Sequence, residues 1–218
     1  TDAIELALRA VGLQAGDGVA VPANTVSATI AAVIAAGGTP VFCDVDPATM
    51  TLSPGKLREL LDTPRGAAVR AVVPVHLYGQ PCAMAPIVAL AEERGLQVVE
   101  DCAQAAGASV GGRAVGRFGD IGIFSFQLNK NMTSGDGGML VAEDDALFRR
   151  IVALHDLGYP RNEKGRLDSS DENCQLWGMG ARMSELAGAM ALAQMRKLPR
   201  ITGAMRAPSG NFASARRN

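Results

Sequence analysis

Residues 96–100 (LQVVE) and 121–126 (IGIFSF) form two short apolar runs that decide the fold, and polar residues follow each of them. Similar runs rich in β-branched residues occur at 19–21, 40–45, 71–75 and 139–142. Apolar spacing of three and four residues predicts helices at 2–11, 26–36, 54–61, 83–94, 145–155 and 183–198. Strands that alternate with helices indicate an α/β fold, a three-layer sandwich whose helices cover both faces of a mostly parallel central sheet.

The composition narrows the class of protein. The chain has 218 residues, a formal charge of -1 and 48% hydrophobic residues, which is typical of a soluble α/β enzyme with one large domain, or one domain and part of a second. No segment concentrates basic residues, so we expect no nucleic-acid partner. The longest apolar stretch, near 28–36, is too short to span a membrane.

Cysteine and histidine usage points to a cytoplasmic protein without a metal site. The four cysteines, Cys43, Cys82, Cys102 and Cys174, are scattered without zinc-ligand spacing, as expected of reduced thiols in the cytoplasm. The two histidines, His76 and His155, also lack ligand spacing. We expect structural or loop roles for both, although His76 could line a substrate pocket. Trp177 and Met179 are expected to make packing or dimer contacts.

Three segments bear on how the domain is organised. Thr1 lies directly against a helical pattern without a capping segment, so we expect further sequence upstream. Residues 158–175 are a long polar excursion between helices and predict a surface or interface loop. Residues 207–218 are small, polar and unpatterned, unlike the end of a packed domain.

Lys130 has an unusual position. It is one of only four lysines, and it lies between the apolar run 121–126 and the glycine-rich turn TSGDGG (133–138). Ligands of parallel sheets bind at the carboxyl ends of the strands, where this lysine is expected. A partly desolvated amine there is suited to Schiff-base formation. The alternative is an ordinary loop lysine in water.

Asp101 ends the apolar run of VVEDCAQAAG (98–107), and Gln104 follows three residues later. A carboxylate at the end of a buried strand needs a partner. A protonated pyridine nitrogen is such a partner, and its proton keeps the ring an electron sink. Alternatively, Glu100 and Asp101 begin a loop and cap the next helix.

The third feature consists of two serines and the glycines of the turn, a combination that can bind phosphate through hydroxyl and backbone N–H groups. A plain turn between two strands would look the same. The residues are Ser125, Ser134, Gly135, Gly137 and Gly138. No GxGxxG fingerprint is present, which argues against a nicotinamide-dependent oxidoreductase.

Six segments in this order resemble the DegT/StrS family of pyridoxal-phosphate (PLP)-dependent sugar aminotransferases, which have the aspartate-aminotransferase fold, fold type I. They cover almost all of residues 1–206. The segments are TDAIELALRAVGLQAGDGVAVPANT (1–25), AAGGTPVFCDVDPATMTLSP (35–54), PVHLYGQPCAM (74–84), VVEDCAQAAGA (98–108), GDIGIFSFQLNKNMTSGDGG (119–138) and RMSELAGAMALAQMRKL (182–198). The resemblance implies that residues 1–200 form the PLP-binding large domain without its first part. Residues 201–218 would then be the start, or a remnant, of the C-terminal segment. The resemblance implies that the small C-terminal domain is largely absent.

The resemblance also implies roles for individual residues. Lys130 matches the lysine that forms the Schiff base with PLP and moves a proton as general base and acid. Asp101 matches the aspartate at the pyridine nitrogen, Gln104 the residue beside the ring hydroxyl, and Ser125 a serine on the phosphate. Thr1 matches the last residue of a phosphate-binding Ser-Gly-Thr turn.

Three positions depart from the family pattern. Val26 stands where the family usually has an aromatic residue stacked on the cofactor ring. Gly180, in GMGARMSEL, stands where an asparagine often reaches the phosphate of the partner subunit. Asp136 replaces the glutamate of the usual TxGEGG turn. The first two departures imply weaker cofactor binding or altered chemistry.

The function implied is transfer of an amino group from glutamate or glutamine to a nucleotide-linked keto-sugar or to a keto-cyclitol. The resemblance also implies a homodimer with a shared active site. One alternative is a PLP-dependent sugar dehydratase or lyase on the same scaffold, although such relatives usually have histidine in place of this lysine. The other alternative is a non-catalytic relative that acts as a binding or regulatory protein.

Overall fold

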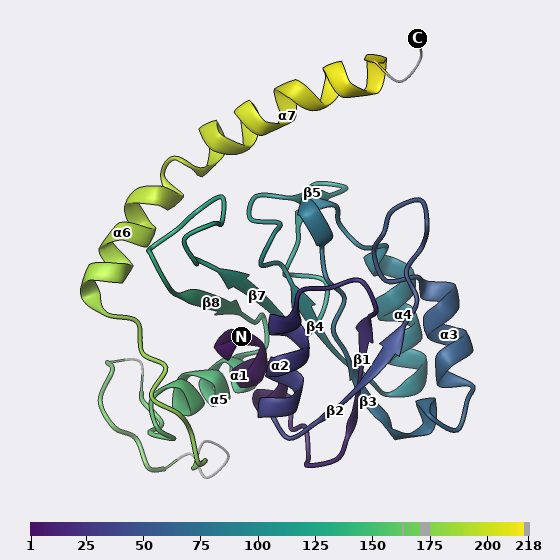
Figure 1. Cartoon of the computed structure of the whole chain (residues 1–218). Coiled ribbons are helices and arrows are strands. Elements are labelled where there is room, and N and C mark those ends of the chain that lie inside the picture. Colours follow the sequence, from purple (N-terminus) through teal and green to yellow (C-terminus); the bar gives the residue numbers. More distant parts are fainter. Residues whose placement is uncertain (163, 171–174, 216–218) are drawn as a thin grey trace.

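The computed structural model contains a six-stranded sheet with helices on both faces (Figure 1). It describes residues 1–162, 164–170 and 175–215, with side chains up to residue 207. The strand order is β2-β1-β3-β4-β7-β8. All neighbours are parallel except β7 and β8, which are antiparallel. The strands are β1 (Gly18–Pro22), β2 (Thr39–Cys43), β3 (Val69–Val72), β4 (Gln97–Asp101), β7 (Ile121–Ser125) and β8 (Gly138–Val141).

The strand order determines which face each connecting helix covers. The chain passes from β1 outward to β2 through α2 (Ser27–Ala35), then returns past β1 to β3 through α3 (Pro54–Leu61). Because crossovers are right-handed, this change of direction places α2 and α3 on opposite faces. α4 (Met84–Arg94) continues in the direction of α3 and packs beside it. α1 (Asp2–Ala10) packs against α2 and α5 (Asp145–His155) on the other face.

Two apolar clusters fill the space between the sheet and its helices. Side chains alternate along each strand, so Val99 faces the cluster under α1, α2 and α5, whereas Val98 faces the cluster under α3 and α4. β1 is buried throughout, as expected of an interior strand of a parallel sheet. The edge strand β2 is not, and Phe42 is half exposed. The helices on both faces therefore bury the interior of the sheet but not this edge.

The predicted α/β sandwich is confirmed, and each of the six predicted strands and six predicted helices has a counterpart. Five elements were not predicted: the hairpin strands β5 (Ser109–Val110) and β6 (Arg113–Ala114), the short helices η1 (Gly66–Ala68) and η2 (Leu77–Gly79), and α7 (Leu198–Ala215). α6 (Glu185–Met195) ends before Pro199, which lies in the first turn of α7, because proline lacks the N–H that an uninterrupted helix needs. α7 spans the expected domain boundary at residue 200, and the backbone of the unpatterned segment is helical up to Ala215.

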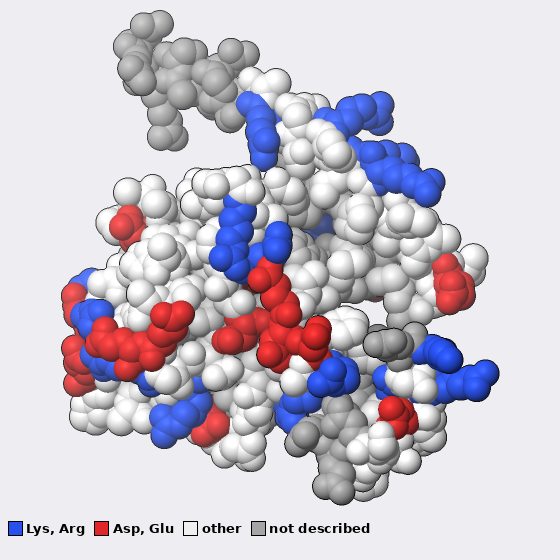
Figure 2. Space-filling model, turned by 180° about the vertical axis from the view of Figure 1, so that it is seen from behind, with Lys and Arg blue, Asp and Glu red and all other residues white. Residues whose placement is uncertain are grey.

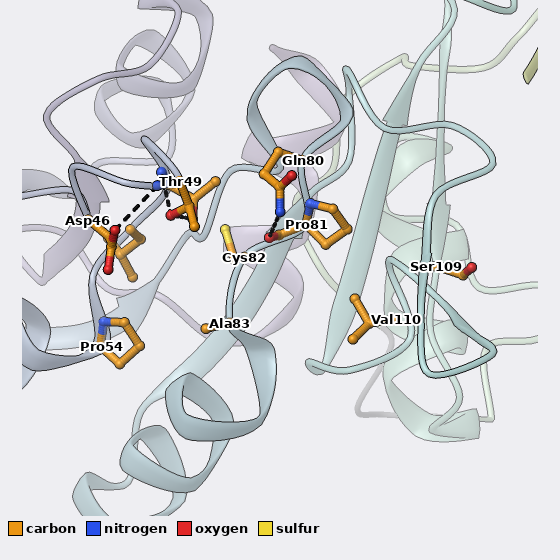
Figure 3. A pocket seen from close by; sticks show the side chains of 11 residues that line it. Asp46, Thr49, Pro54, Gln80, Pro81, Cys82, Ala83, Ser109 and Val110 are labelled. Atoms are coloured by element: carbon orange, nitrogen blue, oxygen red, sulfur yellow. Dashed lines mark hydrogen bonds between the residues drawn. The ribbon is translucent and has the colours of Figure 1, made fainter. Parts of the chain in front are cut away.

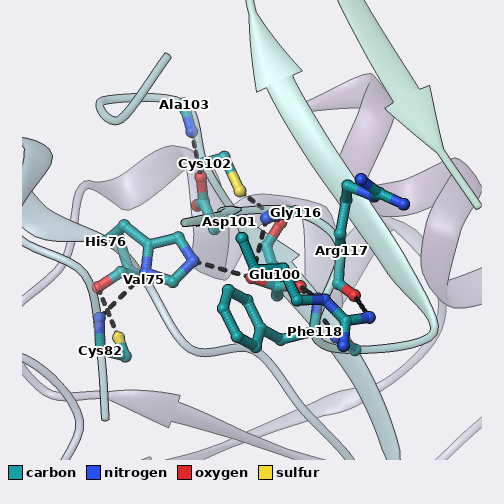
Figure 4. Close-up of polar contacts among 12 residues, drawn as sticks. Val75, His76, Cys82, Glu100, Asp101, Cys102, Ala103, Gly116, Arg117 and Phe118 are labelled. Carbon is teal, nitrogen blue, oxygen red and sulfur yellow. Dashed lines mark hydrogen bonds and ion pairs between the residues drawn. The ribbon is translucent and has the colours of Figure 1, made fainter. Parts of the chain in front are cut away.

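Glu100, the penultimate residue of β4, is held by several hydrogen bonds (Figure 4). Its side chain is fully buried. One carboxylate oxygen accepts from the backbone N–H groups of Phe118 and Gly119, at 2.5 and 2.8 Å. The other accepts from Gly116 N at 2.9 Å and pairs with His76 Nε2 at 3.1 Å. The residues after β6 are thereby fixed against the end of β4.

His76 completes this cluster from the end of β3. Its Nδ1 accepts the backbone N–H of Cys82 at 3.0 Å, so the proton of a neutral ring lies on Nε2 and points to Glu100. Burial favours a raised pKa for Glu100, but the bond from His76 and the N–H groups of Gly119 and Gly116 outweigh it and hold the pKa below its ordinary value. His76 is therefore structural, as expected, and does not line a substrate pocket.

We expect Glu100→Gln to lower the free energy of unfolding by about 3 kcal/mol, because the amide NH₂ would meet groups that are themselves donors. A folded-state pKa below the ordinary 4.5 means that the carboxylate stabilises the fold above that pH and loses its contribution in more acid solution. Urea unfolding from pH 7 downward should show the gap between wild type and variant at full size near neutrality and narrowing below pH 4.5.

The matched control is Glu92→Gln, on the exposed side of α4, which should change the unfolding free energy by less than about 0.5 kcal/mol. An equal effect of both substitutions, or a gap that does not depend on pH, would contradict the role given to Glu100.

Candidate active site at the carboxyl edge of the sheet

Asp101 and Ser125 are the last residues of two neighbouring parallel strands, β4 and β7. In the register of this pair, Asp101 lies opposite Ile123. Because side chains alternate, Ser125 points to the same face as Ile123 and Asp101, the face covered by α1 and α2. Val26 lies at the same edge, as the N-cap of α2 after β1, with half of its side chain exposed. The structure thus brings three of the predicted site residues to one edge of the sheet.

The Asp101 carboxylate is buried but receives only neutral donors. The residue is 4% exposed. Its Oδ1 accepts the backbone N–H of Ala103 at 3.0 Å, and its Oδ2 accepts the hydroxyl of Thr29 at 2.9 Å. No lysine, arginine or histidine forms an ion pair with it in the part of the chain that the structure describes. The alternative, that Asp101 caps a helix, is wrong: a turn follows β4, and Asp101 caps that turn.

Lys130 lies in the loop between β7 and β8, five residues beyond Ser125. A bridge between Gln127 and Gly135 closes this loop, and the Lys130 backbone N–H donates to the Gln127 carbonyl at 2.9 Å. The lysine is partly buried. Its ammonium has no hydrogen bond or ion pair within the described residues, so the amine is available to a ligand. Lys130 and Asp101 therefore belong to adjacent strand ends on the same edge.

The N-terminus of α1 lies beside the start of β8. A Cβ placed at Gly138 would lie 3.5 Å from the Ala3 side chain, and Gly138 pairs with Ser125 in the β7–β8 ladder. Thr1, the N-cap, is exposed at this end. A helix N-terminus next to a serine hydroxyl is a favourable place for an anion.

Gln104 supports the neighbouring turn through its side chain. Its Oε1 accepts the backbone N–H of Tyr78 at 3.0 Å. Tyr78 has a left-handed backbone (φ 53°) and an exposed ring. Gln104 thus joins the loop after β4 to η2, the turn that follows β3.

The glycine-rich turn is only partly available for a phosphate. Ser134 is buried, and its hydroxyl donates to the Asp136 carbonyl at 2.7 Å, so it stabilises the turn. A Cβ at Gly138 would come within 2.9 Å of the Phe124 carbonyl, so close strand packing explains this glycine. The interpretation of the turn as a structural connection therefore accounts for Ser134 and Gly138.

Cys102 lies next to His76 and Glu100, and their potential ligand atoms are within 4.8 Å of one another. Burial raises the pKa of the Cys102 thiol, which keeps it protonated. Both ring nitrogens of His76 and both oxygens of Glu100 already have hydrogen-bond partners. The cluster is thus a hydrogen-bonded network, in which a metal ion would have to displace several bonds.

Two of the hollows on the described surface have linings that include none of Thr1, Val26, Asp101, Gln104, Ser125 and Lys130. The first, of about 420 Å³, is shown in Figure 3. It lies between the residues after β2, the segment before α4 and the β5–β6 hairpin, and its polar side chains include Asp46, Thr49, Thr51, Gln80 and Ser109. The second, of about 550 Å³, lies between β8, α5 and residues 181–183.

An ion-pair cluster in the second hollow orders the segment around Gly180. Asp156 is buried and accepts from Arg161 and Arg182, at 2.5 and 2.7 Å. The hydrogen bond from Arg161, followed by the charges of Arg161 and Arg182, holds the pKa of Asp156 below its ordinary value. Gly180 pairs with Asp156 as an isolated bridge.

The predictions for Trp177 and Met179, which precede Gly180, have different outcomes. Met179 packs against the core, as expected, whereas Trp177 is 96% exposed, so packing within the chain is wrong for it and a dimer contact stays a prediction.

The charged side chains are mixed on the face of the body that Figure 2 displays. Figure 2 shows basic and acidic side chains next to each other there. Ion pairs such as Arg58–Glu93 and Arg94–Asp62 account for part of this mixture. No helix in the described part of the chain is long and apolar enough to cross a membrane.

Sequence reasoning missed Thr29, the hydroxyl that contacts Asp101. It lies in the first turn of α2, 72 positions before Asp101, and is 2% exposed. The available signal was a threonine in a helix that is apolar apart from its first residue and this one, SATIAAVIA. Asp156 was also missed, because its arginine partners come from a loop without periodicity.

The chain is similar in sequence and in fold to known aminotransferases. The chain is 48% identical over 159 residues to UDP-N-acetyl-3-dehydro-α-D-glucosamine 3-aminotransferase of Acidithiobacillus ferrooxidans, which covers 72% of the chain and 42% of that protein. An aminotransferase structure from Psychrobacter cryohalolentis is similar with a TM-score of 0.82 and 38% identity, over 91% of the chain and 50% of that protein.

A third relative was crystallised with a cofactor. NtdA of Bacillus subtilis, solved with bound PMP, has a TM-score of 0.78 and 33% identity, over 90% of this chain and 42% of that one. The chain spans about half the length of the relatives that it matches. The model of the DegT/DnrJ/EryC1/StrS aminotransferase family matches residues 1–208, so the chain belongs to that family.

Proposed function

We propose that the protein is a PLP-dependent aminotransferase that moves an amino group from glutamate or glutamine to a keto-sugar, nucleotide-linked, or to a keto-cyclitol. Membership of the family and the names of the relatives support this activity. The observation that carries it is the buried Asp101 carboxylate, which has two neutral donors and no cation among the described residues.

The chemistry of this carboxylate fits the cofactor. A buried carboxylate is costly without a positive partner, and the protonated ring nitrogen of PLP is a cation of suitable size. Each Asp101 oxygen accepts one hydrogen bond and retains a lone pair for another. The amine of Lys130, on the adjacent strand end, is available for the cofactor's aldehyde group.

When bound, PLP supplies a ring that draws electrons from the α-carbon of the amino acid. Lys130 would hold the cofactor through Nζ and, once displaced, carry the proton that leaves the α-carbon. Asp101 would keep the ring nitrogen protonated. Ser125 and the N-terminus of α1, with Thr1, would bind the phosphate. Gln104 would lie beside the ring hydroxyl, and Val26 would cover one face of the ring.

We also propose that the protein is a cytoplasmic homodimer and that residues 1–200 form its cofactor-binding domain, with 201–218 in the C-terminal segment. Large apolar side chains around α6 support the dimer: Leu186 is 84% exposed, and Leu192 and Met190 are half exposed. Free buried thiols support a reducing compartment, and the pKa values of Cys43 and Cys82 are raised to about 12, mainly by burial. Cys174 lies outside the described residues.

The site predicts that Lys130→Ala abolishes covalent attachment of PLP. In the full-length protein incubated with PLP and reduced with borohydride, mass spectrometry should find one reduced cofactor on the peptide that contains Lys130. The control is Lys56→Ala, on α3, where the ammonium pairs with Glu59 at the surface, and it should label fully. Full labelling of the Lys130 variant would refute the assignment, and an unlabelled wild type would favour a non-catalytic protein.

The activity predicts a half-reaction that needs no sugar. Addition of L-glutamate or L-glutamine to the PLP-loaded protein should convert the visible absorption band of the lysine-bound cofactor to the near-ultraviolet band of PMP. About one equivalent of the oxo-acid should form per site. D-glutamate is the control and should leave the band unchanged. A band that no amino donor alters would reject transamination and favour a lyase.

A further inference from the structure

The proposed function makes no use of a short chain of hydroxyl groups behind Asp101. Thr25 Oγ1 lies 3.0 Å from Thr29 Oγ1, and Thr29 Oγ1 lies 2.9 Å from Asp101 Oδ2. Thr25 follows β1, Thr29 belongs to the first turn of α2, and Asp101 ends β4. Side chains therefore join the start of α2 to the end of β4, 72 positions further along the chain, at the carboxyl edge of the sheet.

The direction of these bonds follows from the donors available. An ionised carboxylate only accepts hydrogen bonds, so the single hydroxyl proton of Thr29 points to Asp101. Thr29 Oγ1 is then the acceptor in its contact with Thr25, which must donate. The chain has one polarity, from the partly exposed Thr25 through the buried Thr29 to the carboxylate.

This arrangement holds the carboxylate at both oxygens from different elements. Oδ1 is held by the backbone N–H of Ala103, within the loop after β4, and Oδ2 by a side chain of α2. Rotation about the Cβ–Cγ bond of Asp101 would break both bonds. The plane of the carboxylate, and with it the direction of the remaining lone pairs, is therefore fixed before any ligand binds.

We propose that Thr29 is a positioning residue that aims the Asp101 carboxylate at the ring nitrogen of PLP, with Thr25 as its outer support. This inference rests on the proposed function. Val26 and Thr29 lie three residues apart at the start of α2, so that turn would provide both a contact to the ring face and the orientation of the ring-nitrogen partner.

The test compares two cofactors that differ at one atom. Thr29→Val keeps the shape of the side chain and removes the hydroxyl, so we expect the full-length protein to bind PLP about tenfold more weakly. The 1-deaza analogue of PLP has carbon in place of the ring nitrogen. Its affinity for the Thr29→Val variant should differ by less than about twofold from its affinity for the wild-type protein. The dissociation constants come from absorbance titrations, without any measurement of turnover.

Two further variants separate positioning from packing. Thr29→Ser retains the hydroxyl and should restore the wild-type affinity for PLP. Thr25→Val removes only the outer donor and should weaken PLP binding by about two- to threefold. If Thr29→Val does not fold, as judged by urea unfolding, Thr29→Ala gives the same comparison without new atoms.

The outcomes distinguish this inference from the function on which it rests. Equal losses for PLP and its deaza analogue would mean that Thr29 acts through packing alone and would overturn the proposal. Unchanged affinity for PLP in Thr29→Val would overturn it as well. A wild-type protein that binds neither cofactor would instead reject the proposed function.

Discussion

The carboxyl edge of this sheet depends on two adjacent carboxylates at the end of β4. Because both are buried, each needs hydrogen-bond partners from the surrounding elements. Strand geometry directs Glu100 to the face covered by α3 and α4, and Asp101 to the face covered by α1 and α2. Glu100 receives backbone N–H groups and the ring of His76. Asp101 receives one N–H and one hydroxyl. The same side-chain chemistry thus closes the fold on one face and leaves an acceptor for a ligand on the other.

The two networks support each other through the backbone. The His76 backbone N–H donates to the carbonyl of Asp101, and Val75 pairs with Asp101 as a parallel bridge. Glu100 fixes the loop from Gly116, which passes so close to β7 that a Cβ at Gly122 would come within 2.3 Å of the Gly116 carbonyl. The strand that ends in Ser125 is therefore held in register with the one that ends in Asp101. Rigid neighbouring strands let two side chains from distant segments keep a fixed separation.

The fold could be predicted from the sequence because its strands and helices are short, regular and strongly apolar. The carboxyl ends of neighbouring parallel strands lie at one edge of a sheet, and the register of β4 and β7 places Asp101 and Ser125 there. The β5–β6 hairpin was missed because it has only two residues in each strand, and α7 because its second half has no apolar repeat. Contacts such as Thr29–Asp101 and His76–Glu100 could not be predicted, since they depend on which helix crosses which strand end.

The departures at Val26 and Gly180 have different structural weight. Val26 keeps the extended backbone of an N-cap, and its carbonyl accepts the N–H of Thr29, so the start of α2 does not depend on an aromatic side chain there. A valine offers a ring less contact area than an aromatic residue, so under the proposed function more of the cofactor's binding would depend on Asp101. Gly180 pairs with Asp156, whose two arginines fix the backbone of that segment without any side chain at position 180. The segment is thus held in place by charge and needs no side chain at position 180.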